Sequence, residues 1–108
     1  MHILMCNDDG ILADGLRRLA PYLSQYYRIT VVAPANEQSA KSHALTTEVP
    51  LKLDACNGED ENPRLYALTG TPSDCMKFGL SYLLTDDMPD LVISGINHGF
   101  NLGSDVLY

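Results

Sequence analysis

ILMCNDDG, residues 3–10, is a short apolar run that passes directly into Asn7, two adjacent aspartates and a glycine. An apolar run of this kind is typical of a buried strand, so Asp8 and Asp9 are expected where that strand reaches the surface, at its carboxyl end. Ligands of open α/β sheets bind at that end of the strands. The stretch therefore predicts an α/β fold with acidic side chains at its ligand-binding edge.

The two aspartates suggest a cation site. Adjacent side chains of an extended chain point to opposite sides, but a turn at Gly10 would let both carboxylates reach one ion. Carboxylate oxygens favour a hard cation, Mg²⁺ or Mn²⁺ rather than Zn²⁺. Taken alone, however, an Asp-Asp-Gly motif is more often a helix cap or a turn.

The composition narrows the class of protein. The chain has 108 residues, which suits one domain with a modest core. Its 7 basic and 14 acidic residues give a formal charge of -7, so neither a nucleic-acid polymer nor an anionic membrane is an expected partner. A phosphate-bearing substrate would need a metal to offset that charge. The sequence lacks a membrane-span pattern and a signal-peptide pattern, which predicts a cytoplasmic protein.

The three cysteines are scattered and include no Cys-x-x-Cys pair, so neither a disulfide framework nor a zinc knuckle is expected. Cys6 stands beside the carboxylates and could be a reactive thiol. A small buried hydrophobe on a strand is the preferred interpretation.

The sequence predicts core strands at 2–6, 28–33 and 90–94. A helix between the first two is expected to be capped by Asp14 and to kink or end near Pro21. Its apolar face follows the helical period and comprises Leu16, Leu19, Ala20 and Leu23. Two strands joined by one helix indicate a βαβ unit and hence a parallel sheet.

A hairpin is expected between these elements. Residues 47–53 alternate apolar and polar side chains, and Pro50 favours a sheet edge. A second strand is predicted at 64–68, after an acidic turn region at 57–63 that we expect to form a loose, solvated tip.

The segment TGTPSDC, residues 69–75, predicts a helix start with Thr71 as N-cap, Pro72 in the first helical position and Asp74 three residues after the cap. The same helix start could hold a phosphate, but Asp74 would compete with an anion there. We therefore prefer the structural interpretation.

The segment after the last predicted strand, INHGFNLGSD at 96–105, alternates glycine and asparagine. Asn97 offers a carbonyl oxygen to an ion, and the glycines allow the backbone to bend sharply. On its own the segment is explained equally well by a turn or by a ligand site. His98 could act as an acid or base, although a surface position is preferred.

Together these motifs resemble the SurE family of survival-protein nucleotidases, because NDDG, a Ser39-containing loop, GTPSDC and SGINHGFNLGSD occur in the family's order. The resemblance implies an α/β fold, a Rossmann-like three-layer sandwich with a mostly parallel core sheet and a projecting β-hairpin. Residues 1–108 would be the N-terminal part of a single domain of this type. Family members are longer, so the chain is expected to be truncated and impaired in catalysis.

The resemblance also implies a function, a divalent-metal-dependent 5'-nucleotidase that hydrolyses nucleoside monophosphates. Further candidate substrates are 3'-nucleotides and short polyphosphates. Each subunit would hold one Mg²⁺ or Mn²⁺ ion that activates a water to attack phosphorus. Carried over by motif, the metal-binding positions are Asp8, Asp9, Ser39 and Asn97. The catalytic positions are Asp8 and Asp9, and the substrate-binding positions are Asn97, Gly99 and Asn101. Gly99, Asn101 and Gly103 would line the substrate side of their loop, which is a weaker transfer than that of the metal ligands. A homo-oligomer, dimer or tetramer, is expected of the full-length family.

The sequence departs from the family pattern before Ser39, where Asn36, Glu37 and Gln38 replace more basic residues and Ala40 replaces a frequent glycine. Substrate preference is therefore expected to differ. One alternative is a non-catalytic, Rossmann-like nucleotide-binding module. Another is a phosphatase of the haloacid-dehalogenase type, but Asn7 stands where that class needs a nucleophilic aspartate.

Overall fold

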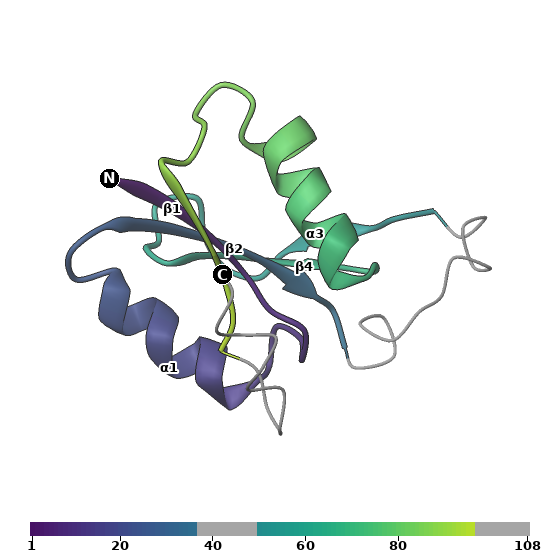
Figure 1. Ribbon diagram of the computed structural model, residues 1–108, viewed down its shortest axis with the longest axis horizontal. Coiled ribbons are helices and arrows are strands. Elements are labelled where there is room, and N and C mark those ends of the chain that lie inside the picture. Colours follow the sequence, from purple (N-terminus) through teal and green to yellow (C-terminus); the bar gives the residue numbers. More distant parts are fainter. Residues whose placement is uncertain (37–49, 97–108) are drawn as a thin grey trace.

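The protein is a three-layer α/β sandwich, seen in a computed structural model that describes residues 1–36 and 50–96. The described residues form a five-stranded sheet, and the two α-helices lie on opposite faces of it (Figure 1). In chain order the elements are β1 His2–Cys6, α1 Asp14–Leu23, β2 Arg28–Pro34, β3 Leu53–Ala55, β4 Arg64–Leu68, α3 Pro72–Phe78, the π-helical η2 Gly79–Leu83, and β5 Leu91–Ser94.

The strand order is β3-β4-β2-β1-β5. Neighbouring pairs among β4, β2, β1 and β5 are parallel, and only the β3–β4 pair is antiparallel. The predicted α/β fold with a mostly parallel sheet is therefore confirmed. Because parallel strands end at the same edge, the segments that follow β1, β2, β4 and β5 all start at one side of the molecule.

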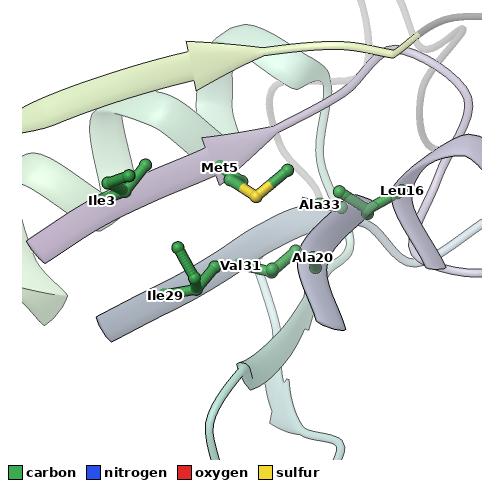
Figure 2. Close-up of a cluster of buried hydrophobic side chains, with 7 residues drawn as sticks. All are labelled: Ile3, Met5, Leu16, Ala20, Ile29, Val31 and Ala33. Carbon is green, nitrogen blue, oxygen red and sulfur yellow. The ribbon is translucent and has the colours of Figure 1, made fainter. Parts of the chain in front are cut away.

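Alternate side chains of the central strands point to the two faces of the sheet and build two separate cores. The face covered by α1 is packed as predicted, with Leu16 and Ala20 of the helix lying against β1 and β2 (Figure 2). The buried residues of this core are Ile3, Met5, Leu16, Ala20, Ile29, Val31 and Ala33. The core beneath α3 comprises Leu4, Cys6, Val32, Leu68, Cys75 and Leu84.

The start of α1 differs from the prediction, because its N-cap is Ala13 and not Asp14. Ala13 has an extended backbone, and its carbonyl accepts the first helical hydrogen bond, from the Arg17 amide at 3.0 Å. Asp14 instead places its charge in the first turn, where the helix dipole favours it. The helix ends at Leu23, close to Pro21 as expected, although Pro21 itself lies inside the helix.

The predicted hairpin is present, but its first strand is shorter than expected. The sequence pattern placed that strand at 47–53, whereas β3 covers only Leu53–Ala55 and residues 50–52 lie outside any strand. Residues 47–49 are outside the described part. The second strand, β4, has the predicted bounds and pairs with β2 along its whole length. The hairpin therefore extends the core sheet and does not simply project from it.

The expected loose tip of this hairpin is tied down by two asparagines. The Asn57 amide group donates to the Pro63 carbonyl at 2.8 Å, and its oxygen accepts from the Leu65 amide at 2.9 Å. Asn62 accepts from the Ile29 amide at 2.8 Å, so it fastens the tip to the start of β2. These side chains satisfy backbone groups that a solvated tip would leave to water.

The last strand, β5, was expected in the core. Within the described residues it is an edge strand next to β1, and Leu91 and Val92 are 46% and 37% exposed. Its apolar composition alone could not distinguish a central strand from this edge position.

The start of α3 confirms the predicted capping box. The Thr71 hydroxyl accepts from the Asp74 amide at 3.2 Å, and the Asp74 carboxylate accepts from the Thr71 amide at 3.0 Å. Beyond Phe78 the helix continues as a π-helical turn, closed by a bond from the Leu84 amide to the Gly79 carbonyl at 2.9 Å. No helix in the described ranges has the length and apolarity needed to cross a bilayer.

The capping box gives a stability prediction. Thr71→Ala removes the hydroxyl acceptor and leaves the Asp74 amide without its partner, so we expect the free energy of unfolding to fall by about 1 kcal/mol. Urea unfolding monitored by circular dichroism measures this loss. Thr71→Ser retains the cap and should retain most of the stability. Ser73→Ala, an exposed position in the same turn, is the control, and an equal loss there would contradict the assigned role of Thr71.

Candidate functional site

The two predicted aspartates lie at the carboxyl end of β1, the strand that is flanked by β2 and β5. The backbone stays buried through Asn7, which has no exposed surface. Asp8 is then exposed and Asp9 is half-buried. The prediction that these carboxylates appear where a buried strand surfaces is therefore confirmed.

A tight turn carries the aspartate pair. The Asn7 side-chain amide donates to the Gly10 carbonyl at 2.8 Å, and the Gly10 amide donates back to the Asn7 side-chain oxygen at 3.1 Å. Gly10 has a φ of +110°, which a residue with a side chain rarely adopts. The expected turn at Gly10 is present, and Asn7 closes it.

Backbone hydrogen bonds join this turn to the ends of the neighbouring strands. The Ile11 amide donates to the Pro34 carbonyl at the end of β2, at 2.8 Å, and the Ala35 amide donates to the Leu68 carbonyl at the end of β4, also at 2.8 Å. On the other side of β1, the Gly95 amide donates to the Cys6 carbonyl at 2.9 Å. The segments that follow four parallel strands are therefore held together at one edge of the sheet.

A cleft of about 500 Å³ opens at this edge, between the turn, the start of α1 and the segment after β2. Its size is within the usual range of small-molecule sites. Both Asp9 and Asn36 contribute to its wall. The complete lining is Asp9, Gly10, Leu12, Ala13, Asp14, Ala35 and Asn36.

The other predicted site residues, Ser39, Asn97, Gly99, Asn101 and Gly103, lie outside the described residues, as does His98. The described residues nearest to them in sequence can be placed. Asn36 lines the cleft, and Ile96 follows β5 and lies against the start of α1. A side-chain carbon added to Gly15 would come within 3.1 Å of the Ile96 carbonyl oxygen, so this contact depends on a glycine.

The donor chemistry of the edge fits a hard cation. In residues 1–36 and 50–96 no group of three or more histidine, cysteine, aspartate and glutamate side chains could hold a metal. A site made of three or more of these side chains is therefore not formed within those ranges, whether its ligands are nitrogen, sulfur or carboxylate oxygen. Asp8 and Asp9 offer carboxylate oxygens, which suit Mg²⁺ or Mn²⁺ once hydroxyl, amide or water oxygens complete the shell.

The Cys6 thiol, beside the aspartates, is buried. Burial raises the pKa of Cys6 to about 12, so its thiol stays protonated at neutral pH. Burial likewise raises the pKa of Cys75 to about 12. The preferred interpretation of Cys6 as a small buried hydrophobe is therefore confirmed, because its side chain is 1% exposed in the core beneath α3.

A second cleft, of about 550 Å³, lies at the opposite edge of the sheet, where the parallel strands begin. Its wall includes Arg28 and Asp87, which pair with each other at 2.7 Å. That pairing neutralises two of the charges that a ligand could use, and ligands of α/β sheets bind at the other edge. The cleft beside Asp9 is therefore the better candidate site.

The thiols give a reactivity prediction. At pH 8 Cys56, which is exposed, should react readily with iodoacetamide, whereas Cys6 and Cys75 should remain unmodified until the chain is unfolded. Peptide mass spectrometry of protein alkylated before and after urea treatment measures this difference. Rapid alkylation of Cys6 in the folded protein would instead make it a candidate reactive group.

The fold and the site at the carboxyl ends of the parallel strands together define a Rossmann-like α/β protein whose candidate site offers oxygen donors. The family model for the survival protein SurE matches residues 3–108, and the chain belongs to this family. The resemblance suggested by the sequence motifs is therefore confirmed.

Several similar proteins carry the family's name. The chain is 52% identical over 108 residues to a protein named 5'-nucleotidase SurE from Thermoanaerobacter sp. (strain X514), covering all of this chain and 42% of that protein. A protein of the same name from Vibrio vulnificus (strain YJ016) is 48% identical, and the match covers 100% of this chain and 40% of that protein. The crystal structure of the SurE protein from Aquifex aeolicus matches with a TM-score of 0.78 and 38% identity, over 99% of this chain and 42% of that chain. The chain thus spans about two-fifths of the length of these relatives.

Proposed function

We propose that this chain carries the metal-binding edge of a divalent-metal-dependent 5'-nucleotidase that hydrolyses nucleoside monophosphates. The observation that carries the proposal is the Asp8–Asp9 pair at the carboxyl end of β1, with Asp9 in the wall of a cleft of about 500 Å³. The relatives named 5'-nucleotidase SurE support the reaction class. The proposed ligands are Asp8, Asp9, Ser39 and Asn97, and the proposed substrate contacts are Asn97, Gly99 and Asn101.

Charge explains why such a site needs a cation. The chain has a formal charge of -7, and the aspartate pair adds negative potential where a phosphate would have to enter. A bound Mg²⁺ or Mn²⁺, one per subunit, would supply positive charge that offsets the phosphate and polarises its oxygens. The proposed role of Asp8 and Asp9 is to bind that metal ion and to fix its position relative to the cleft.

A covalent aspartyl-phosphate route, as in the haloacid-dehalogenase class, is disfavoured by Asn7. Both ends of its side-chain amide are bonded to Gly10, and the residue is fully buried. An amide in this position cannot serve as the nucleophile that the class requires. Direct attack by water on phosphorus is therefore the proposed reaction, and the role of Asp8 and Asp9 is limited to ligands.

The remaining elements of the proposal concern the complete protein. By analogy with the family resemblance, we propose a cytoplasmic homo-oligomer, dimer or tetramer. Candidate substrates beyond 5'-nucleotides are 3'-nucleotides and short polyphosphates.

Removing one ligand tests the proposal. We expect Asp9→Asn to abolish Mn²⁺-dependent hydrolysis of nucleoside monophosphates and to weaken Mn²⁺ binding, because a neutral amide replaces a charged oxygen ligand. Phosphate release with and without Mn²⁺, in this chain and in a version extended beyond Tyr108, measures the first effect. Calorimetric titration with Mn²⁺ measures the second.

Asp54→Asn is the matched control, because it makes the same change in charge at an exposed position of β3. The Asp54 carboxylate forms an ion pair with Lys52 at 4.0 Å. Equal effects of the two substitutions would reduce the role of Asp9 to general electrostatics and remove it from the site. Nucleotide binding without any hydrolysis in the extended protein would instead favour the non-catalytic nucleotide-binding module.

A further inference from the structure

Asn7 is a polar residue of the NDDG motif and is completely buried, with 0% of its surface exposed. It directly follows the apolar strand β1 and directly precedes Asp8. A polar side chain at such a position costs free energy unless its donors and acceptor are satisfied. Its partners therefore decide what the residue does.

Within the described residues, the Asn7 side chain is bonded to Gly10, on the far side of the aspartate pair. The Asn7 side chain donates to the Gly10 carbonyl at 2.8 Å and accepts from the Gly10 amide at 3.1 Å. These two bonds close a hydrogen-bonded ring that includes the backbone of Asp8 and Asp9. The amide of asparagine is suited to this task because it carries a donor and an acceptor side by side.

Gly10 is in turn fixed to the end of β2. Its φ of +110° is a backbone conformation that residues with a side chain rarely adopt, and an added carbon would also lie in tight contact with the Pro34 carbonyl oxygen, at 3.3 Å. The next residue, Ile11, donates its amide to that same carbonyl at 2.8 Å. The turn is therefore anchored to the sheet at both ends, through Asn7 directly after β1 and through Pro34 at the end of β2.

We propose that Asn7 is a positioning residue for the Asp8–Asp9 pair, and that its double hydrogen bond to Gly10 holds the two carboxylates ready to bind a divalent cation. The inference rests on the proposed function, because it assigns Asn7 its task through the cation site. Loss of the Asn7–Gly10 bonds removes two of the restraints on the turn, and a cation then has to order the turn further as it binds.

Alternative side chains at this position separate positioning from simple folding. Serine is shorter and replaces the asparagine turn only partly, because its hydroxyl makes weaker bonds to nearby backbone. Alanine makes none. Metal affinity should therefore fall in the order wild type, Asn7→Ser, Asn7→Ala, provided that the β-sheet remains intact.

The test measures Mn²⁺ dissociation constants by calorimetric titration of the 108-residue chain and its variants, with circular dichroism to verify folding. We expect Asn7→Ala to raise the dissociation constant about ten- to a hundredfold, the usual effect of removing a group that orients a metal ligand, with Asn7→Ser in between. If Asn7→Ala does not fold, Asn7→Ser alone is compared with wild type. A second readout needs no metal: deuterium uptake at residues 8–10 should be faster in the Asn7 variants.

Thr30→Val is the matched control. It removes another buried polar side chain, which bonds the His2 ring at 2.8 Å at the opposite end of the sheet. This variant should keep wild-type Mn²⁺ affinity and wild-type uptake at residues 8–10. A loss of affinity equal to that of the Asn7 variants would reduce the effect to general destabilisation and overturn the inference.

The outcomes distinguish this inference from the proposed function. If Asp9→Asn loses Mn²⁺ binding and a folded Asn7→Ala keeps it, the positioning role is wrong while the metal site stands. If Asp9→Asn keeps wild-type affinity, the metal site itself is wrong, and with it the task given to Asn7. Unchanged deuterium uptake at residues 8–10 in Asn7→Ala would overturn the claim that its side chain holds the turn.

Discussion

The burial of β1 on both faces constrains everything around it. All of His2–Cys6 is buried, because α1 covers one face of the sheet and α3 covers the opposite face (Figure 1). A charged side chain within the strand would therefore cost free energy, whereas one just beyond its end can be solvated. Asn7 marks that boundary. It is buried like the strand but polar, and its side chain forms two hydrogen bonds with the backbone of Gly10. The aspartate pair is thereby placed at the first point where the chain meets water, in a turn of fixed shape.

The parallel sheet then brings other segments to the same place. Hydrogen bonds join the turn after β1 to the end of β2, the end of β2 to the end of β4, and β5 to the end of β1. Pairing of this kind follows from strand register, because parallel neighbours of similar length finish side by side. A site at this edge can therefore draw ligands from stretches far apart in the sequence. This is why motifs that are each ambiguous become informative when their strands are known to be neighbours.

Much of the fold was predictable, since β1, β2, β4 and the start of α3 are encoded by local patterns of apolar and capping residues. The errors have physical causes. Asp14 has a side chain that suits an N-cap, but the backbone turns one residue earlier, at Ala13. The polar alternation before Leu53 resembles a strand, yet pairing with β4 begins only at that residue. Sheet position, such as the location of β5 at the edge of the sheet that the described residues form, depends on partners distant in sequence, which local periodicity does not report.

The site was predictable in part. The location of Asp8 and Asp9 followed from the apolar run before them, and the turn followed from Gly10. The closing role of Asn7 did not, although asparagine side chains often hydrogen-bond to nearby backbone in turns. The proposed ligand set joins Asp8 and Asp9 to Ser39 and Asn97 through the family resemblance.

The most direct test of this account is a crystal structure of the chain soaked with Mn²⁺, located by its anomalous scattering. The account predicts one ion at the carboxyl end of β1, bound by oxygens of Asp8, Asp9, Ser39 and Asn97. An ion bound elsewhere, or no ion at this edge at saturating Mn²⁺, would contradict it.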